Sequence, residues 1–167
     1  MQIRPAFPAD AAAITAIYAH HVLHGTGTFE EVPPPADEMT RRMAAIQSRG
    51  WPWLVATDGG DVIGYAYAGQ FRDRAAYRYS SENSVYVRHD AVGRGVGRAL
   101  LDALMPAAAA CGFRRMFAVI GDSANMGSIR LHHACGFSMA GRFDEAGHKF
   151  GRDLDVVFMQ RRLEKQP

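Results

Sequence analysis

Hydrophobic residues recur every three to four positions in the first third of the chain, which is the spacing of an amphipathic helix. Two such stripes are present, and their members are Ile14, Ile17, Tyr18 and Val22 in the first and Met39, Met43 and Ile46 in the second. Pro8-Ala9-Asp10 supplies a start signal for the first helix, and the glycine- and threonine-rich stretch from His24 to Phe29 ends it. We therefore expect two helices joined by a loop, after a short strand around Ile3.

From residue 53 the pattern changes to that of strands. Residues 53–57 and 62–68 are apolar runs joined by the turn sequence Asp58-Gly59-Gly60-Asp61, which predicts a β-hairpin. The polar stretch 70–83 is expected to be a loop, and the β-type run Ser84–Val87 a strand in the middle of the sheet.

The second half of the chain alternates between the two patterns. A glycine-rich turn at 92–98 opens a helix that ends near Gly112, and Pro106 inside it predicts a kink or a break near Met105. The remaining predicted elements are a strand at 116–120, a helix at 128–134 and two strands near 138–143 and 154–160. This order predicts a mixed α/β protein with one parallel crossover, formed as one domain over residues 1–167.

Composition narrows the possible functions. The chain has 167 residues, 48% hydrophobic and 22% charged, which is typical of one globular domain and excludes a disordered chain. Its net charge of +2 provides no basic field for nucleic acid. No apolar run is long enough for a membrane helix and no secretory pattern opens the chain, so we expect a cytoplasmic protein. Cys111 and Cys135 indicate no disulfide framework.

Histidines give no convincing metal site. His20 and His24 have the spacing of a ligand pair on a helix, but no acidic or cysteine partners accompany them. We expect no bound metal.

The strongest chemical signal is a glycine-rich turn that follows a strand. Gly93-Arg94-Gly95-Val96-Gly97-Arg98 comes after Val85-Tyr86-Val87 and begins a helix, where free N–H groups and the helix dipole bind phosphate. The dinucleotide fingerprint would need glycine at Arg98, and the Gly-Lys-Ser/Thr ending of a Walker loop is absent. The glycines alone also fit a tight turn without a ligand.

Beyond this turn, the motifs resemble those of the GNAT N-acetyltransferases. The core of the resemblance consists of residues 85–101, Asn125–His132 and Gly136-Phe137. Further motifs resemble the branch that acetylates phosphinothricin and methionine sulfoximine or sulfone, and they are Thr28-Phe29-Glu30-Glu31, the loop with Arg72, Arg74 and Tyr77, Glu82, Gly147–Arg152 and Leu154–Phe158. The resemblance implies an α/β GNAT (acyl-CoA N-acyltransferase) fold, with a mixed twisted sheet whose central parallel strands splay apart between flanking helices.

The resemblance also implies a reaction in which a substrate amine attacks the thioester of acetyl-CoA directly. The amine must lose a proton, and Glu82 is the candidate base. A backbone N–H of the Val85–Val87 strand is expected to meet the carbonyl oxygen. His132 stands where many GNAT enzymes use a tyrosine, and either it or water protonates the leaving thiolate.

Binding residues follow from the same resemblance. For acetyl-CoA they are Val85, Tyr86, Val87, Gly93, Arg94, Gly95, Val96, Gly97, Arg98, Asn125 and Ser128. For the acceptor they are Phe29, Arg72, Asp73, Arg74, Tyr77 and Glu82. Val92 departs from the family pattern, which has glutamine or arginine there, so one side-chain contribution to the phosphate loop is missing.

The arginines of the loop can grip a carboxylate or a phosphinate through paired N–H donors, although a charged loop can also be merely solvated. The branch further implies a homodimer, with Lys149 and Phe150 on a late hairpin close to the active site. Two alternatives stay open: an acetyltransferase for another amine, such as a peptide N-terminus or a polyamine, and a catalytically silent acyl-CoA-binding module.

Overall fold

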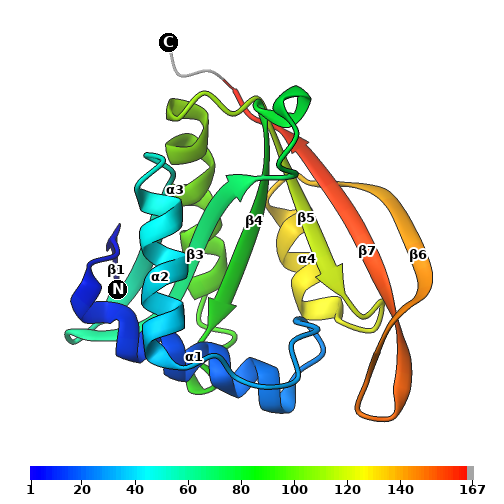
Figure 1. The fold of residues 1–167 in the computed structure, drawn as a ribbon, viewed down its shortest axis with the longest axis horizontal. Helices are drawn as coiled ribbons and strands as arrows, with labels where there is room; N and C mark the ends of the chain where they lie inside the picture. The colour runs from blue at the N-terminus through cyan, green and yellow to red at the C-terminus, as the bar shows by residue number, and fades with distance from the viewer. Residues whose placement is uncertain (165–167) are drawn as a thin grey trace.

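A seven-stranded sheet in the order β1-β2-β3-β4-β5-β7-β6 forms the centre of the computed structural model, which describes residues 1–164 (Figure 1). The strands are β1 (Gln2–Pro5), β2 (Trp53–Asp58), β3 (Asp61–Gln70), β4 (Ser80–Val87), β5 (Arg115–Gly121), β6 (Ser138–Lys149) and β7 (Arg152–Arg162). The helices are α1 (Ala11–His24), α2 (Ala36–Gln47), α3 (Val96–Ala110) and α4 (Met126–Ala134), with short 3-10 turns at Pro8–Asp10, Ala75–Tyr77 and His89–Ala91. The mixed α/β architecture expected from the sequence is confirmed.

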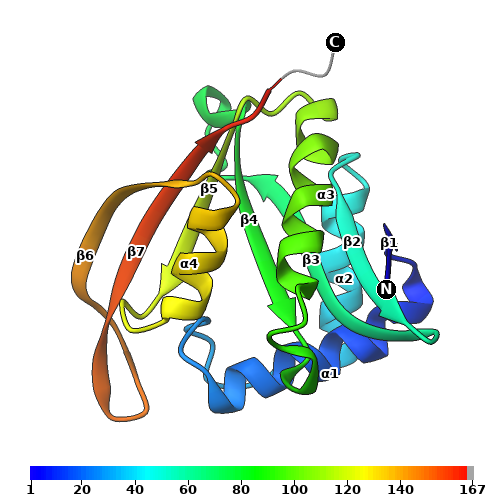
Figure 2. The same ribbon diagram turned by 180° about the vertical axis from the view of Figure 1, so that it is seen from behind.

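Strands β4 and β5 form the parallel pair of this sheet, and they separate partway along their length. Residues 80–83 of β4 pair with residues 115–118 of β5. Beyond Asn83, β4 stays paired with β3 as far as Val87, and β5 stays paired with β7 as far as Gly121. A gap therefore opens between β4 and β5, and it is visible between these strands in both ribbon views (Figures 1 and 2).

Helices cover the two faces of the sheet unequally. Helices α1 and α2 lie over the half formed by β1 to β4, whereas no described helix lies over β5, β7 and β6 on that face (Figure 1). Helices α3 and α4 lie on the opposite face (Figure 2). One face of β5 and β7 is therefore open beside α2.

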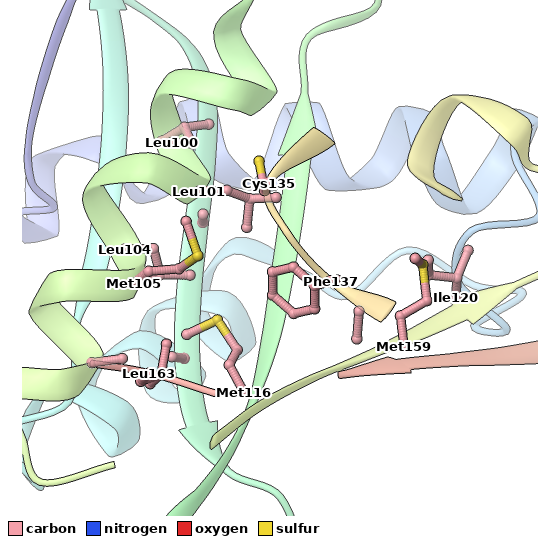
Figure 3. Close-up of a cluster of buried hydrophobic side chains, with 14 of the residues drawn as sticks. Leu100, Leu101, Leu104, Met105, Met116, Ile120, Cys135, Phe137, Met159 and Leu163 are labelled. Carbon is pink, nitrogen blue, oxygen red and sulfur yellow. The ribbon is translucent and has the colours of Figure 1, made fainter. Parts of the chain in front are cut away.

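The larger of two hydrophobic clusters joins α3 to the sheet. Leu100, Leu101 and Leu104 of α3 are fully buried against Met116 of β5 and Met159 of β7 (Figure 3). Burying each leucine contributes about 1.5–3 kcal/mol. This cluster fixes α3 beside the gap between β4 and β5.

Pro106 does not break α3, contrary to the sequence prediction. The helix runs without interruption from Val96 to Ala110. Pro106 lies on the exposed side of the helix, as does Asp102, whose carbonyl loses its helical partner and can bind water instead. The cost of about 3 kcal/mol for a proline inside a helix is offset by the leucines on the buried side.

Three strands are longer than their hydrophobic pattern indicates. Strand β4 begins at Ser80 rather than at Ser84, so Glu82 lies within the strand and not ahead of it. Ser81 and Asn83 are buried and bond backbone carbonyls of β5, which explains why a central strand has a polar sequence. Strands β6 and β7 continue to a two-residue turn at Phe150-Gly151, where both residues have positive φ, as a tight hairpin turn requires.

Candidate active site

A cleft of about 830 Å³ occupies the gap between β4 and β5. It is lined by every residue that the sequence assigns to the cofactor except Arg94, namely Val85, Tyr86, Val87, Gly93, Gly95, Val96, Gly97, Arg98, Asn125 and Ser128. His132 also lines the cleft. The separation of β4 and β5 thus creates one cleft that is lined by residues from distant parts of the chain.

Three glycines lie just before α3 or in its first turn, and each is required for its own structural reason. Gly93 and Gly95 have φ values of 81° and 80°, in the left-handed region that favours glycine. A Cβ on Gly97 would lie 2.9 Å from a methyl carbon of Leu131, so glycine allows α3 and α4 to approach. Gly95 is the N-cap of α3 and no side chain caps this end, which leaves the first N–H groups of the helix available to an anion.

The two arginines of this turn are engaged in ion pairs. Arg94 points away from the cleft, and its Nη2 lies 2.6 Å from Oδ2 of Asp58. Its assignment to the cofactor stays a prediction, and in this structure the exposed ion pair holds the side chain at the β2–β3 turn. Arg98 lines the cleft, but its Nε donates to Asp102 at 2.7 Å. Backbone N–H groups rather than arginine charges dominate the end of the cleft at this turn.

Glu82 lies at the point of separation, on the face opposite to Asn83. Side chains alternate along a strand, and Asn83 contacts His132 of α4, so Glu82 projects toward the α1 and α2 face. Its carboxylate is half-buried and accepts no hydrogen bond from residues 1–164. Burial raises the pKa of Glu82, and the nearby charge of Arg72 lowers it by less. A half-buried carboxylate with raised pKa and free oxygens is suited to accept a proton.

Arg72 is the residue of the 71–79 loop that the structure brings close to Glu82. Its guanidinium lies 4.5 Å from the ring centre of Phe71, which in turn packs on Phe117 at 4.7 Å. Phe117 is the β5 partner of Glu82 in the sheet. Asp73, Arg74 and Tyr77 are exposed, and they and Arg72 lie outside the lining of the cleft.

Phe29 packs between two glycines at the edge of the cleft. A Cβ on Gly147 would lie 2.2 Å from a carbon of its ring, and one on Gly121 would lie 2.8 Å from another. The ring is still 37% exposed. Phe29 thus holds its loop against the end of β5 and against β6, and it keeps one side open to a ligand.

Lys149 and Asp122 fix the loop that carries Phe29, and sequence reasoning did not assign this role. Lys149 is only 2% exposed, and its Nζ donates to the carbonyls of Gly25 and Thr28 at 2.9 Å each. Burial lowers the pKa of Lys149. Asp122, with a φ of 69°, accepts hydrogen bonds from Thr26 at 2.9 Å and from Arg152 at 2.7 Å. Sequence gives no signal for the contacts with this loop, because Lys149 and Asp122 are about a hundred residues from their partners in it.

His132 is the buried histidine of α4, whereas His133 faces solvent. Its Nδ1 lies 2.8 Å from the carbonyl oxygen of Ser128 and its Nε2 lies 3.0 Å from Oδ1 of Asn83. Burial lowers the pKa of His132, and the Ser128 carbonyl opposes this effect. Asn125 caps α4 by accepting from the N–H of Ser128 at 3.2 Å.

The described residues contain no cluster of three or more side chains able to hold a metal ion. His20 instead stacks on His89, with ring centres 4.4 Å apart. Within residues 1–164, no helix has the length and apolar character needed to cross a membrane.

The fold and the site together define an α/β protein with a cleft between two parallel strands, and the helix N-terminus at one end of this cleft is suited to bind a phosphate. Residues 3–158 match the family described as the acetyltransferase (GNAT) domain. The chain belongs to the GNAT acetyltransferase family.

Individual relatives are similar over nearly the whole chain. A phosphinothricin N-acetyltransferase of Alcaligenes faecalis is 51% identical over 154 residues, which cover 92% of this chain and 78% of that protein. An L-methionine sulfoximine/L-methionine sulfone acetyltransferase of Salmonella typhimurium is 43% identical over 165 residues, covering 99% and 96%. A solved phosphinothricin acetyltransferase of Sinorhizobium meliloti, in complex with AcCoA, gives a TM-score of 0.94 at 48% identity and covers 97% of this chain and 88% of that chain.

The buried lysine yields a stability prediction. Lys149→Met leaves the carbonyls of Gly25 and Thr28 without a donor, so we expect the free energy of unfolding to fall by about 1–3 kcal/mol. Urea denaturation measures this loss, and hydrogen exchange of residues 25–29 should accelerate. Arg142→Met, at an exposed position of the same strand, is the control and should change stability by less than about 0.5 kcal/mol. Equal effects of the two variants would contradict the role assigned to Lys149.

Proposed function

We propose that this protein transfers the acetyl group of acetyl-CoA to the α-amino group of a small amino acid or amino-acid analogue. L-methionine sulfoximine, L-methionine sulfone and L-phosphinothricin are the acceptors that the names of its relatives suggest. The observation that carries the proposal is the position of Glu82: a half-buried carboxylate that accepts no hydrogen bond from residues 1–164 stands where β4 and β5 separate, beside the cleft.

Acetyl-CoA binds in the cleft according to this proposal. Its pyrophosphate lies against the N–H groups around Gly95 and Gly97 at the start of α3, and its pantetheine arm extends along the unpaired edge of β4. Val92 supplies no polar side chain here, so the backbone provides most of the affinity. The relative from Sinorhizobium meliloti, solved with AcCoA, supports this choice of cofactor.

The proposed reaction needs three groups, and each can be assigned to a part of the chain near the separation of β4 and β5. Glu82 takes a proton from the substrate ammonium, directly or through water, so that the amine nitrogen can attack the thioester carbon. A backbone N–H of Val85–Val87 stabilises the oxygen that gains charge. After the attack the nitrogen loses a second proton to water, the C–S bond breaks with its electron pair passing to sulfur, and His132 or water protonates the thiolate.

The acceptor approaches from the open face of β4 and β5. Glu82 lies on the α2 side of the sheet, because its β3 partner Gly69 faces Ile46 of α2, and the charge of Arg72 is close enough to lower the pKa of Glu82. A guanidinium binds the oxygens of a carboxylate or a phosphinate through paired N–H groups. This favours an anionic acceptor over a polyamine, which an arginine would repel.

We also propose that the protein is a homodimer that acts in the cytoplasm. β6 is an edge strand with exposed apolar side chains, among them Met139 and Phe143. Such an edge favours pairing with a second chain. Cys111 and Cys135 are both free thiols, which suits a reducing compartment.

The homodimer predicts a species of twice the chain mass of 18.3 kDa in sedimentation velocity. Phe143→Ser should shift the equilibrium toward the monomer, because it removes a side chain that is 63% exposed on the edge strand. Phe7→Ser, at an exposed phenylalanine near the N-terminus, should leave the mass unchanged. A wild-type protein that sediments as an 18.3 kDa species at all concentrations would refute the dimer.

The acceptor class is tested by release of free thiol from acetyl-CoA. L-phosphinothricin, L-methionine sulfoximine, L-methionine sulfone, L-methionine, spermidine and a short peptide are offered in parallel. Saturable turnover with the first three supports the proposal. Turnover with only spermidine or the peptide would replace the acceptor, and binding of acetyl-CoA without any turnover would favour a silent binding module.

Arg72→Ala should raise KM for L-phosphinothricin about tenfold or more, because one charge-assisted hydrogen bond is lost. Its matched control is Arg78→Ala in the same loop, whose guanidinium stacks on Tyr79 and bonds the carbonyl of Ala75. The control should retain the wild-type KM. If both variants have the same KM, Arg72 does not bind the acceptor.

Glu82→Gln should lower kcat about 100-fold or more while acetyl-CoA binds with unchanged affinity, since an amide cannot accept the proton. Burial raises the pKa of Glu82 above its ordinary value of 4.5, and the carboxylate is the active form. The wild-type rate should therefore fall as pH decreases through a value above 4.5. Calorimetry with acetyl-CoA verifies binding, and a variant that retains full turnover would exclude Glu82 as the base.

A further inference from the structure

Asn83 connects the separating strands to His132. Its Nδ2 donates to the backbone carbonyl of Phe117 in β5 at 3.0 Å, and its Oδ1 lies 3.0 Å from Nε2 of His132. It is the last residue of β4 that pairs with β5, and it is buried in the wall of the cleft. One side chain thus contacts both the point of separation and the histidine.

The contact with Phe117 fixes the orientation of the Asn83 amide. A backbone carbonyl can only accept a hydrogen bond, so the NH₂ group of Asn83 must face Phe117. The amide oxygen must then face His132, and an amide oxygen can only accept. Nε2 of His132 is therefore the nitrogen that has to carry hydrogen.

The other nitrogen of the ring also faces an acceptor. Nδ1 lies 2.8 Å from the Ser128 carbonyl oxygen, whereas the Ser128 hydroxyl, which could donate, is more distant at 3.4 Å. A neutral imidazole has one N–H and can satisfy one of the two oxygens, but the imidazolium donates to both. The hydrogen-bond geometry thus favours the doubly protonated imidazolium, whereas burial favours the neutral ring.

We propose that Asn83 is a positioning residue that holds a proton on Nε2 of His132, so that this histidine delivers it to the leaving thiolate. This inference rests on the proposed acetyl transfer. As the C–S bond breaks, its electron pair passes to sulfur and the Nε2 proton moves to sulfur. The ring then holds one proton, as Nδ1–H donating to Ser128, only until water returns a proton to Nε2, where Asn83 again accepts it.

Three uncharged groups contact the His132 ring. Asn83 faces it from β4, Ser128 from the preceding turn of α4, and the Phe137 ring meets it edge-on with centres 5.1 Å apart. Each of these three contacts is uncharged, and the Ser128 carbonyl opposes the lowering of the His132 pKa by burial.

Nitrogen-15 NMR of the histidine rings tests the assignment, with the His132 signals identified by their absence in His132→Gln. In the wild type, Nε2 should carry hydrogen at every pH. Asn83→Ala should lower the pKa of His132 by about one unit, and Asn83→Asp should raise it, because a carboxylate stabilises the imidazolium. A wild-type ring protonated on Nδ1 alone would overturn the proposal even if neither variant folds.

Ser81→Ala is a matched control. Ser81 also bonds across from β4 to β5, donating from its hydroxyl to the carbonyl of Arg115 at 3.0 Å, but it lies two residues before Asn83. This variant loses a comparable cross-strand bond, and it should leave the pKa of His132 unchanged. A shift equal to that of Asn83→Ala would mean that strand pairing, not the amide oxygen, controls the histidine, and would refute the proposal.

Turnover gives an independent readout. The alkaline limb of kcat should move to lower pH in Asn83→Ala by the same amount as the pKa, with KM for acetyl-CoA nearly unchanged. A limb that stays in place while the pKa moves would show that His132 delivers no proton in the rate-limiting step, and would overturn the proposal. If no acceptor is acetylated, the proposed function fails, whereas the NMR result still decides whether Asn83 holds the proton.

Discussion

The structure depends on the separation of two parallel strands after four shared residue pairs. β4 keeps a partner in β3 and β5 keeps one in β7, so each strand remains part of the sheet while its other edge becomes free. Unpaired backbone groups away from water are costly, which makes these edges receptive to a ligand that carries amides of its own. The fold creates a binding site where β4 and β5 do not form the hydrogen bonds that a continuous sheet would have.

The alternation of side chains along β4 then divides the chemistry between two faces. Glu82 projects toward the face that carries α2, whereas Asn83 projects toward α4 and His132. In a continuous sheet these faces would be isolated from each other. Because the strands separate immediately after these two residues, the roles proposed for Glu82 on one face and for His132 on the other can meet on atoms in the same gap.

The parts of the fold that follow from local pattern were predictable, and those that depend on distant contacts were not. The stripe of Ile14, Ile17 and Val22 identifies α1 because one face of the helix is buried. The start of β4 escaped prediction because Ser81 and Asn83 make their hydrogen bonds to a strand about thirty residues later. In the site, the glycine-rich turn that the sequence singles out lines the cleft, whereas the pairing of Arg94 with Asp58 could not be read from sequence.

The contact between Lys149 and the loop at 24–29 shows how a buried charge can fix the position of a loop. A charged lysine without water is costly unless its hydrogens are bonded, and Lys149 satisfies two of them with backbone carbonyls of that loop. An apolar side chain would fill the same space without specifying where the carbonyls lie. Asp122 acts on the same loop through Thr26, and its positive φ is a strain of about 1–3 kcal/mol that these contacts must sustain. Directional polar contacts, rather than hydrophobic burial, therefore determine where the wall of the cleft stands, while the core around α3 supplies the stability that makes such contacts possible.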